Sequence, residues 1–161
     1  MKKHLILLAL ILTAVFTEAQ EQSIELPPIK HHSLYLELGG SSILYSLNYD
    51  YTFRTSEKTK LCIGVGAAAW AIDPIPSPDN KDAKTTFFPF ITPHFNILHG
   101  RYAHHLETGA FLNTTLGPAP GIRVGYRYQK PTGGFLFRAG IAASYIGAII
   151  PIPGLSFGYT F

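Results

Sequence analysis

The C-terminal stretch Leu155-Ser156-Phe157-Gly158-Tyr159-Thr160-Phe161 alternates large apolar residues with small or polar ones. Because successive side chains of a β-strand point to opposite faces, this pattern predicts a strand with one aromatic-rich face and one slim polar face. A soluble sheet would bury the aromatic face in a core. In a membrane barrel, the aromatic face meets lipid and the slim face lines a narrow lumen.

Turn-forming residues divide the rest of the chain into segments that repeat this alternation. The clearest example is 43–53, where large apolar residues occupy every second position. Together with the C-terminal strand, which follows Pro151-Ile152-Pro153-Gly154, eight strands are predicted. The first seven span 33–39, 43–53, 61–70, 87–98, 103–115, 122–129 and 135–146. Turns are expected at 40–42 and 54–60, and the Pro- and Asp-rich segment 72–86 is the longest predicted loop.

Eight strands of about ten residues fit a single small barrel and leave no room for a second domain. We therefore expect an all-β fold: a single antiparallel up-and-down transmembrane β-barrel over 33–161. An N-terminal lead at 20–32 and a cleaved signal peptide at 1–19 are expected to precede it.

The N-terminus has the pattern of a secretory signal peptide. A basic start, Met1-Lys2-Lys3-His4, precedes an apolar run at 5–16, and Thr17 and Ala19 supply the small residues of a cleavage site. The apolar run is well short of the roughly 20 residues that a helix needs to cross a bilayer. We therefore expect cleavage after Ala19 rather than a helical anchor.

The composition favours a membrane barrel over an average soluble domain. Charged residues make up 14% of the chain, against about 25% in typical soluble proteins. No second apolar stretch is long enough for a helical span, and a closed barrel is the other structure that pairs all backbone groups within lipid. The lone Cys62 excludes an internal disulfide. The net charge is +3, but the basic residues do not form a basic patch in the sequence, so a nucleic-acid partner is not expected.

An even number of strands places both barrel termini at one end, which in bacterial outer-membrane barrels is the periplasmic end. Loop 72–86 then faces outside. Aromatic residues of the outward parity gather at the periplasmic end of their strands, where they would form an interfacial girdle. They are Tyr49, Tyr51, Phe53, Tyr126, Tyr128, Phe135, Phe137, Tyr159 and Phe161.

The opposite parity, which faces the lumen, carries the charges of the predicted strands. The charge network consists of Glu37, Asp50, Glu107, Arg123, Arg127 and Arg138, and the same face carries Tyr35, Asn48, His94, Asn96 and His105. Charges in so narrow a space must be paired and hydrogen-bonded. Glu107 lies on the strand next to Arg123 and Arg127, so cross-strand pairing between them is expected. The favoured interpretation is a lumen filled by salt bridges, and a conducting or catalytic role for these charges is the alternative.

The remaining candidate residues do not form a convincing catalytic or metal site. His31-His32 and His104-His105 are pairs of adjacent strand residues, which point to opposite faces, so they cannot jointly hold one ion. His94 and His105 are expected near the periplasmic end, whereas the lumen serines Ser46 and Ser144 lie toward the outside, which argues against a Ser-His-acid triad. No catalytic residues, metal or cofactor are therefore predicted.

The signal at 1–19, the alternating strands and the terminal Gly158-Tyr159-Thr160-Phe161 together resemble the small eight-stranded outer-membrane β-barrel class, similar to the membrane domain of OmpA. The resemblance covers essentially the whole mature sequence. It implies that Tyr159 and Phe161 form the signal read by the barrel assembly machinery. More narrowly, His104-His105-Leu106-Glu107 and 133–140 resemble uncharacterised small outer-membrane proteins of Gram-negative bacteria, a match that implies no activity.

Two functional hypotheses follow. The first is an integral outer-membrane barrel, a monomer in contact with outer-membrane lipid, with a structural or surface-interaction role through its extracellular loops, chiefly 72–86. The alternative is a barrel that handles lipid or another small ligand, including an enzyme or a narrow channel. A secreted soluble barrel of the lipocalin type is disfavoured, because it would place nine aromatic residues on its solvent-exposed face.

The first prediction concerns location. The mature protein should begin at Gln20 and fractionate with the outer membrane, because the signal peptide directs export and the outward strand faces are apolar. N-terminal sequencing and membrane fractionation measure both properties. An intact Met1, or recovery from the soluble periplasm, would contradict the prediction.

Overall fold

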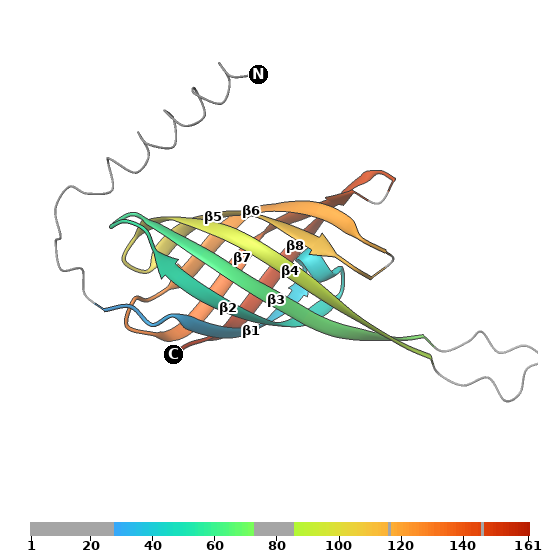
Figure 1. The fold of residues 1–161 in the computed structure, drawn as a ribbon, viewed down its shortest axis with the longest axis horizontal. Helices are drawn as coiled ribbons and strands as arrows, with labels where there is room; N and C mark the ends of the chain where they lie inside the picture. The colour runs from blue at the N-terminus through green and yellow to red at the C-terminus, as the bar shows by residue number, and fades with distance from the viewer. Residues whose placement is uncertain (1–27, 73–85, 116, 146) are drawn as a thin grey trace, which may run out of the picture.

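The computed structural model describes residues 28–72, 86–115, 117–145 and 147–161. These residues form a closed eight-stranded antiparallel barrel in which each strand pairs with its neighbours in the sequence and β1 pairs with β8 (Figure 1). The strands are β1 (His32–Gly39), β2 (Tyr45–Arg54), β3 (Thr59–Ile72), β4 (Thr86–Arg101), β5 (His104–Asn113), β6 (Ala119–Gln129), β7 (Gly134–Tyr145) and β8 (Ile149–Thr160). The predicted fold class is confirmed. The expectations for 1–19, for most of 20–32 and for loop 72–86 concern segments that lie largely outside the described residues.

Backbone hydrogen bonds tie the two ends of the barrel sheet together. His32 N donates to Phe161 O over 3.1 Å, and Phe161 N donates to His32 O over 2.8 Å. The start of β1 and the end of β8 therefore lie at the same end of the barrel, which we call the termini end (Figure 1). We call the opposite end the mouth. Among the described residues, no helix is long and apolar enough to cross a membrane.

The predicted alternation between the two strand faces is also confirmed. In β2, every second side chain from Ser46 to Thr52 is buried inside the barrel, while Tyr45, Leu47 and Tyr49 are exposed outside. In β8, Ser156 and Thr160 are buried, whereas Leu155, Phe157 and Tyr159 are exposed. In these two strands, the aromatic residues thus face outward, and the small and polar residues face the lumen.

Two of the three predicted turns have different boundaries in the structure. Residues 54–60 were expected to form a charged turn, but Thr59 and Lys60 belong to β3, and Lys60 is 4% exposed within the lumen. Residues 151–154 were expected to precede the last strand, but β8 begins at Ile149. Residues 40–42 lie between the first two strands, as predicted, and they form the short, buried 3-10 helix η2 (Gly40–Ser42).

Prolines inside β4 and β8 are tolerated because one edge of each strand is free where they occur. β4 pairs with β5 only from His94 onward, so Pro89 and Pro93 lie before that contact begins. Likewise β8 pairs with β1 only from Gly154 onward, beyond Pro153. A proline lacks the N–H that a neighbouring strand would accept, so such free edges are where strands accommodate it. This explains why Pro151 and Pro153 extend a strand instead of ending it.

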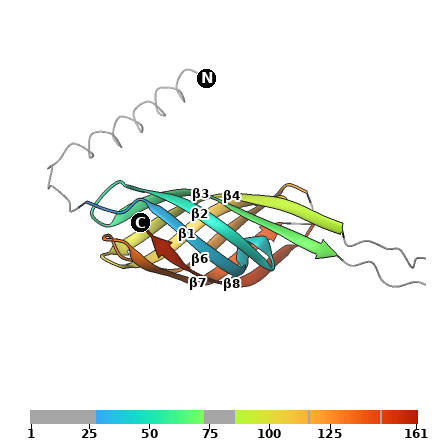
Figure 2. The ribbon, with the colours of Figure 1, turned by 90° about the horizontal axis from the view of Figure 1, so that it is seen from below.

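The β3–β4 hairpin extends past its neighbours at the mouth (Figure 2). β2 pairs with β3 only up to Ala67, so the ends of β3 and β4 pair mainly with each other. This arm, residues 68–72 and 86–93, carries Phe87 at 67% exposure and an edge-to-face contact between Trp70 and Phe90, whose ring centroids lie 5.6 Å apart. The arm adds an aromatic projection to the barrel.

The second prediction concerns Gly64, which faces the lumen on β3. A Cβ at this position would lie 2.2 Å from Asp50 Oδ1 and 2.5 Å from His94 Nε2. We expect Gly64→Ala to displace this buried pair and to lower the free energy of unfolding by about 1–3 kcal/mol. Urea unfolding of the purified barrel measures the change. Val65→Ala, on the outward face of the same strand, is the control, and an equal effect of both variants would contradict the prediction.

Candidate functional site: the charged lumen

All six residues of the predicted charge network point into the barrel, and they come from five strands. Glu37 lies on β1, Asp50 on β2, Glu107 on β5, Arg123 and Arg127 on β6, and Arg138 on β7. Their side chains are between 0% and 8% exposed. The alternation of the strands therefore brings every predicted member of the network into one enclosed space.

Each carboxylate accepts a hydrogen bond from one arginine. Arg138 binds Glu107 through two guanidinium nitrogens, with Nε donating to Oε2 over 2.9 Å and Nη2 donating to Oε1. Arg127 Nη1 donates to Asp50 Oδ2 over 2.7 Å, and Arg123 Nη2 donates to Glu37 Oε1. Such charge-assisted and two-pronged hydrogen bonds are the strong ones in proteins.

The expected pairing of Glu107 with Arg123 and Arg127 is present only as longer contacts, at 3.9 Å in both cases. The strand register explains the difference. On β6, Gly125 lies directly opposite Glu107, so neither arginine is its immediate cross-strand neighbour. Arg138 reaches Glu107 from β7, over the space that Gly125 leaves open. The pairing thus skips the intervening strand β6 instead of joining directly neighbouring strands.

A second cluster surrounds Asp50 near the middle of the barrel. His94 Nε2 lies 2.6 Å from Asp50 Oδ1, and the Tyr35 hydroxyl donates to the same oxygen over 3.0 Å. The guanidinium of Arg138 lies 4.6 Å from the centre of the Tyr35 ring, a cation–π contact. His94 was expected near the periplasmic end, but the pairing of His94 with Gly64 and Phe111 places it deeper. The hydroxyl next to this His-Asp pair belongs to a tyrosine, not to a serine.

The helix η2 folds into the lumen and closes it on the mouth side of the charged residues. Ser41 Oγ donates to Glu37 Oε2 over 2.6 Å, and Asn113 Nδ2 donates to the Ser41 carbonyl over 2.7 Å. Ser42 Oγ lies 3.4 Å from Thr92 Oγ1. These contacts attach the β1–β2 connection to strands on several sides of the barrel. We refer to η2 as the plug.

A row of glycines crosses four strands next to the plug, and one of them makes room for it. The register aligns Gly125 with Gly140, Gly140 with Gly154, and Gly154 with Gly39 across four strands. A Cβ at Gly154 would lie 2.9 Å from the Cα of Gly40 in the plug. A larger residue at position 154 would therefore collide with the plug.

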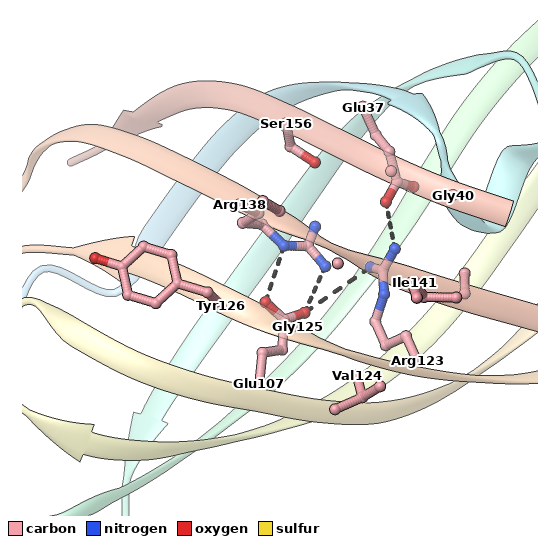
Figure 3. A pocket seen from close by; sticks show the side chains of 14 residues that line it. Glu37, Gly40, Glu107, Arg123, Val124, Gly125, Tyr126, Arg138, Ile141 and Ser156 are labelled. Atoms are coloured by element: carbon pink, nitrogen blue, oxygen red, sulfur yellow. Dashed lines mark hydrogen bonds and ion pairs between the residues drawn. The ribbon is translucent and has the colours of Figure 1, made fainter.

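Little space remains among the charged groups. Figure 3 shows Glu37, Glu107, Arg123 and Arg138 converging on a cavity of about 20 Å³. A cavity needs about 10–15 Å³ to hold one water molecule, so this space admits little more than one. The centre of the lumen is therefore filled by side chains.

The termini end of the lumen is closed as well. Leu98 and Leu136 are fully buried there, and Lys60 Nζ donates to His105 Nε2 over 2.9 Å. Lys60 was missed in the sequence because it adjoins a charged, turn-like segment. Its parity with Cys62 and Gly64 on the same strand was the signal that could have identified it.

The histidine pairs lie apart, as their strand positions predicted. His32 and His104 face outward on β1 and β5, and each shares a 2.6 Å hydrogen bond with a tyrosine hydroxyl, that of Tyr49 and that of Tyr126 respectively. Within the described residues, no group of three or more His, Cys, Asp or Glu side chains could hold a metal ion.

The fold and the lumen define a class, an eight-stranded antiparallel β-barrel whose interior is filled by buried ion pairs. The chain matches no protein-family model, no curated protein and no solved structure.

The third prediction concerns Glu107. Glu107→Gln should lower the free energy of unfolding by about 3–5 kcal/mol, because it leaves buried arginine charge without its closest counter-charge. Combining it with Arg138→Met should recover part of the loss. Urea unfolding measures all three proteins, and Thr108→Ala on the outward face of β5 is the control.

The same filled lumen predicts no large, steady conductance in planar-bilayer recordings of the purified protein, since eight strands enclose only enough space for side chains. Stable large open levels, together with a Glu107→Gln variant as stable as the wild type, would overturn the filled-lumen interpretation.

Proposed function

We propose that the chain is an integral barrel of a bacterial outer membrane, of the class to which the membrane domain of OmpA belongs. The observation that carries the proposal is the inverted distribution of its side chains. Large apolar residues such as Ile63, Phe95 and Ile141 are 44–55% exposed on the outside, while carboxylates and guanidiniums are buried inside. Exposed apolar area on every strand is unfavourable in water and suits a lipid surrounding.

The distribution of aromatic residues supports the orientation of this proposal. Around the termini end, Tyr51 contacts Phe53 with ring centroids 4.7 Å apart, and His32 stacks on Phe161 at 5.8 Å. On β5 and β6, the rings of His104 and Tyr128 contact each other with their centroids 5.4 Å apart. Aromatic rings with polar tips suit the boundary between hydrocarbon and headgroups. The termini end would then be periplasmic, and the plug and the β3–β4 arm would face outside.

The proposed role is structural or one of surface interaction, because the lumen offers no wide path for transport. The β3–β4 arm is the feature best suited to meet an extracellular partner. It stands clear of the neighbouring strands and exposes Phe87 and Phe88 at 67% and 47%. The barrel itself is closed and has no free edge along most of its height, which favours a monomer in contact with outer-membrane lipid.

The alternative function, the handling of a small ligand or lipid, is favoured by one separate observation, a cavity at the mouth of the barrel that is described below. The buried Asp50–His94–Tyr35 cluster does not favour an enzyme, because its groups are used by one another and by Arg127.

The fourth prediction tests insertion through the C-terminal strand. Deleting Phe161 should lower the amount of barrel in the outer membrane much more than Thr160→Ser does, because Phe161 lies on the outward face that the assembly machinery is proposed to read. The deletion also removes two backbone hydrogen bonds to His32, so Phe161→Ala, which keeps the backbone, separates the two effects.

Heat-dependent mobility on gels and outer-membrane fractionation measure the folded, inserted amount. A loss with both Phe161 variants supports the proposal. Wild-type levels of the deletion variant in the outer membrane would contradict the assembly role, and recovery of the wild-type barrel in a soluble fraction would contradict the membrane location.

A further inference from the structure

A second and larger cavity lies at the mouth of the barrel, on the far side of the plug from the charges. Its volume is about 150 Å³, against about 20 Å³ for the cavity among the charged groups. Its walls are aliphatic: Ile43 follows the plug, Ala119 begins β6, and Ile150 and Ile152 belong to the first part of β8. No charged side chain is among its described lining residues.

The plug holds one wall of this mouth cavity in an unusual conformation. Ile43 has a φ of +71°, in the left-handed region that β-branched residues rarely adopt. Hydrogen bonds from Ile43 N to Gly40 O and from Leu44 N to Ser42 O enclose this position on both sides. A strained backbone persists where the surrounding structure imposes it, and such positions often occur at ligand sites. The wall is therefore part of a built feature and not a loose loop.

Two hydroxyl groups at the cavity have no partner within the described part of the chain. Ser144, on β7, is 6% exposed and forms no hydrogen bond with a described residue. The Oγ1 atom of Thr115 is buried and likewise lacks a hydrogen-bond partner there. Buried polar groups are normally hydrogen-bonded, so the buried, unpartnered Thr115 hydroxyl at a largely aliphatic cavity indicates a ligand with a matching polar atom. The nearby Asn113 amide is already used, by Ser41 O and by Thr115 N.

We propose that the mouth cavity binds a neutral aliphatic molecule that carries one hydroxyl or carbonyl group. An apolar cavity of about 150 Å³ accommodates a molecule of about six non-hydrogen atoms, such as benzene. The aliphatic walls receive the hydrocarbon part, and Ser144 and Thr115 hydrogen-bond the polar atom. A charged ligand is excluded because the cavity offers no counter-charge to offset its desolvation. The site belongs to the barrel itself and does not depend on the proposed membrane location.

The test uses 1-hexanol as the probe and NMR of isoleucine methyl groups in the purified, folded barrel. Hexanol should shift the methyl signals of Ile43, Ile150 and Ile152 with a saturable dependence on its concentration. The methyl group of Ile141, which is 52% exposed on the outward face, reports nonspecific partitioning into the surrounding detergent or lipid. Sodium hexanoate, which has the same chain and a negative charge, should produce no saturable shift.

Two variants probe the walls and the hydroxyl separately. Ala119→Leu fills the cavity and should weaken hexanol binding at least tenfold. Ser144→Ala keeps the volume and removes one hydrogen bond, which should weaken binding by about three- to tenfold. Ser156→Ala is the matched control, because Ser156 is also buried, on the adjacent strand, but lines the small central cavity instead.

Saturable shifts that Ala119→Leu abolishes and Ser144→Ala weakens, with Ser156→Ala unchanged, support the proposal. Shifts that rise linearly and in parallel with Ile141 would overturn it, as would hexanoate binding as tight as that of hexanol. If Ala119→Leu does not fold, the comparison of Ser144→Ala with Ser156→Ala decides, and equal affinities in those two variants would overturn the role of the hydroxyl.

Discussion

The mutual neutralisation of six buried charges is the constraint on which the rest of this barrel depends. Glu107 is central to it, since all three guanidinium groups lie within 3.9 Å of its carboxylate. Without Glu107, the directly opposed Arg127 and Arg138 would face each other in a space with little room for water. The ion pairs therefore hold strands on opposite sides of the lumen together. The network also explains why so narrow an interior can be polar at all.

The charge network lies between two ends of the barrel that are closed in different ways. At the termini end, leucines and the Lys60–His105 contact close the lumen. At the mouth, the plug binds Glu37 through Ser41, which links the outer connection directly to the charges. The aliphatic cavity begins beyond this point, where no charge needs a partner. The barrel thus combines a charged, filled centre with a larger cavity of mainly aliphatic lining at its mouth.

A repeated arrangement in the two halves also follows from the barrel's geometry. Tyr49-Asp50-Tyr51 on β2 and Tyr126-Arg127-Tyr128 on β6 have the same pattern, with tyrosines outward and a charge inward. The outward tyrosines each contact a histidine, and the inward charges pair with each other at 2.7 Å. Because Asp50 and Arg127 carry opposite charges at equivalent positions, their ion pair joins β2 and β6 through the centre of the barrel.

The sequence by itself determined the number of strands and the face on which each side chain lies, because a period of two residues is a local property. Glu37, Asp50 and Arg138 were assigned to the lumen on this basis. The partner of each charge, the buried plug and the mouth cavity were decided only by the tertiary structure. They depend on the register between strands, on the space that Gly125 and Gly154 leave open, and on the reach of long side chains across the lumen. These relations join residues far apart in the chain, and no local pattern encodes them.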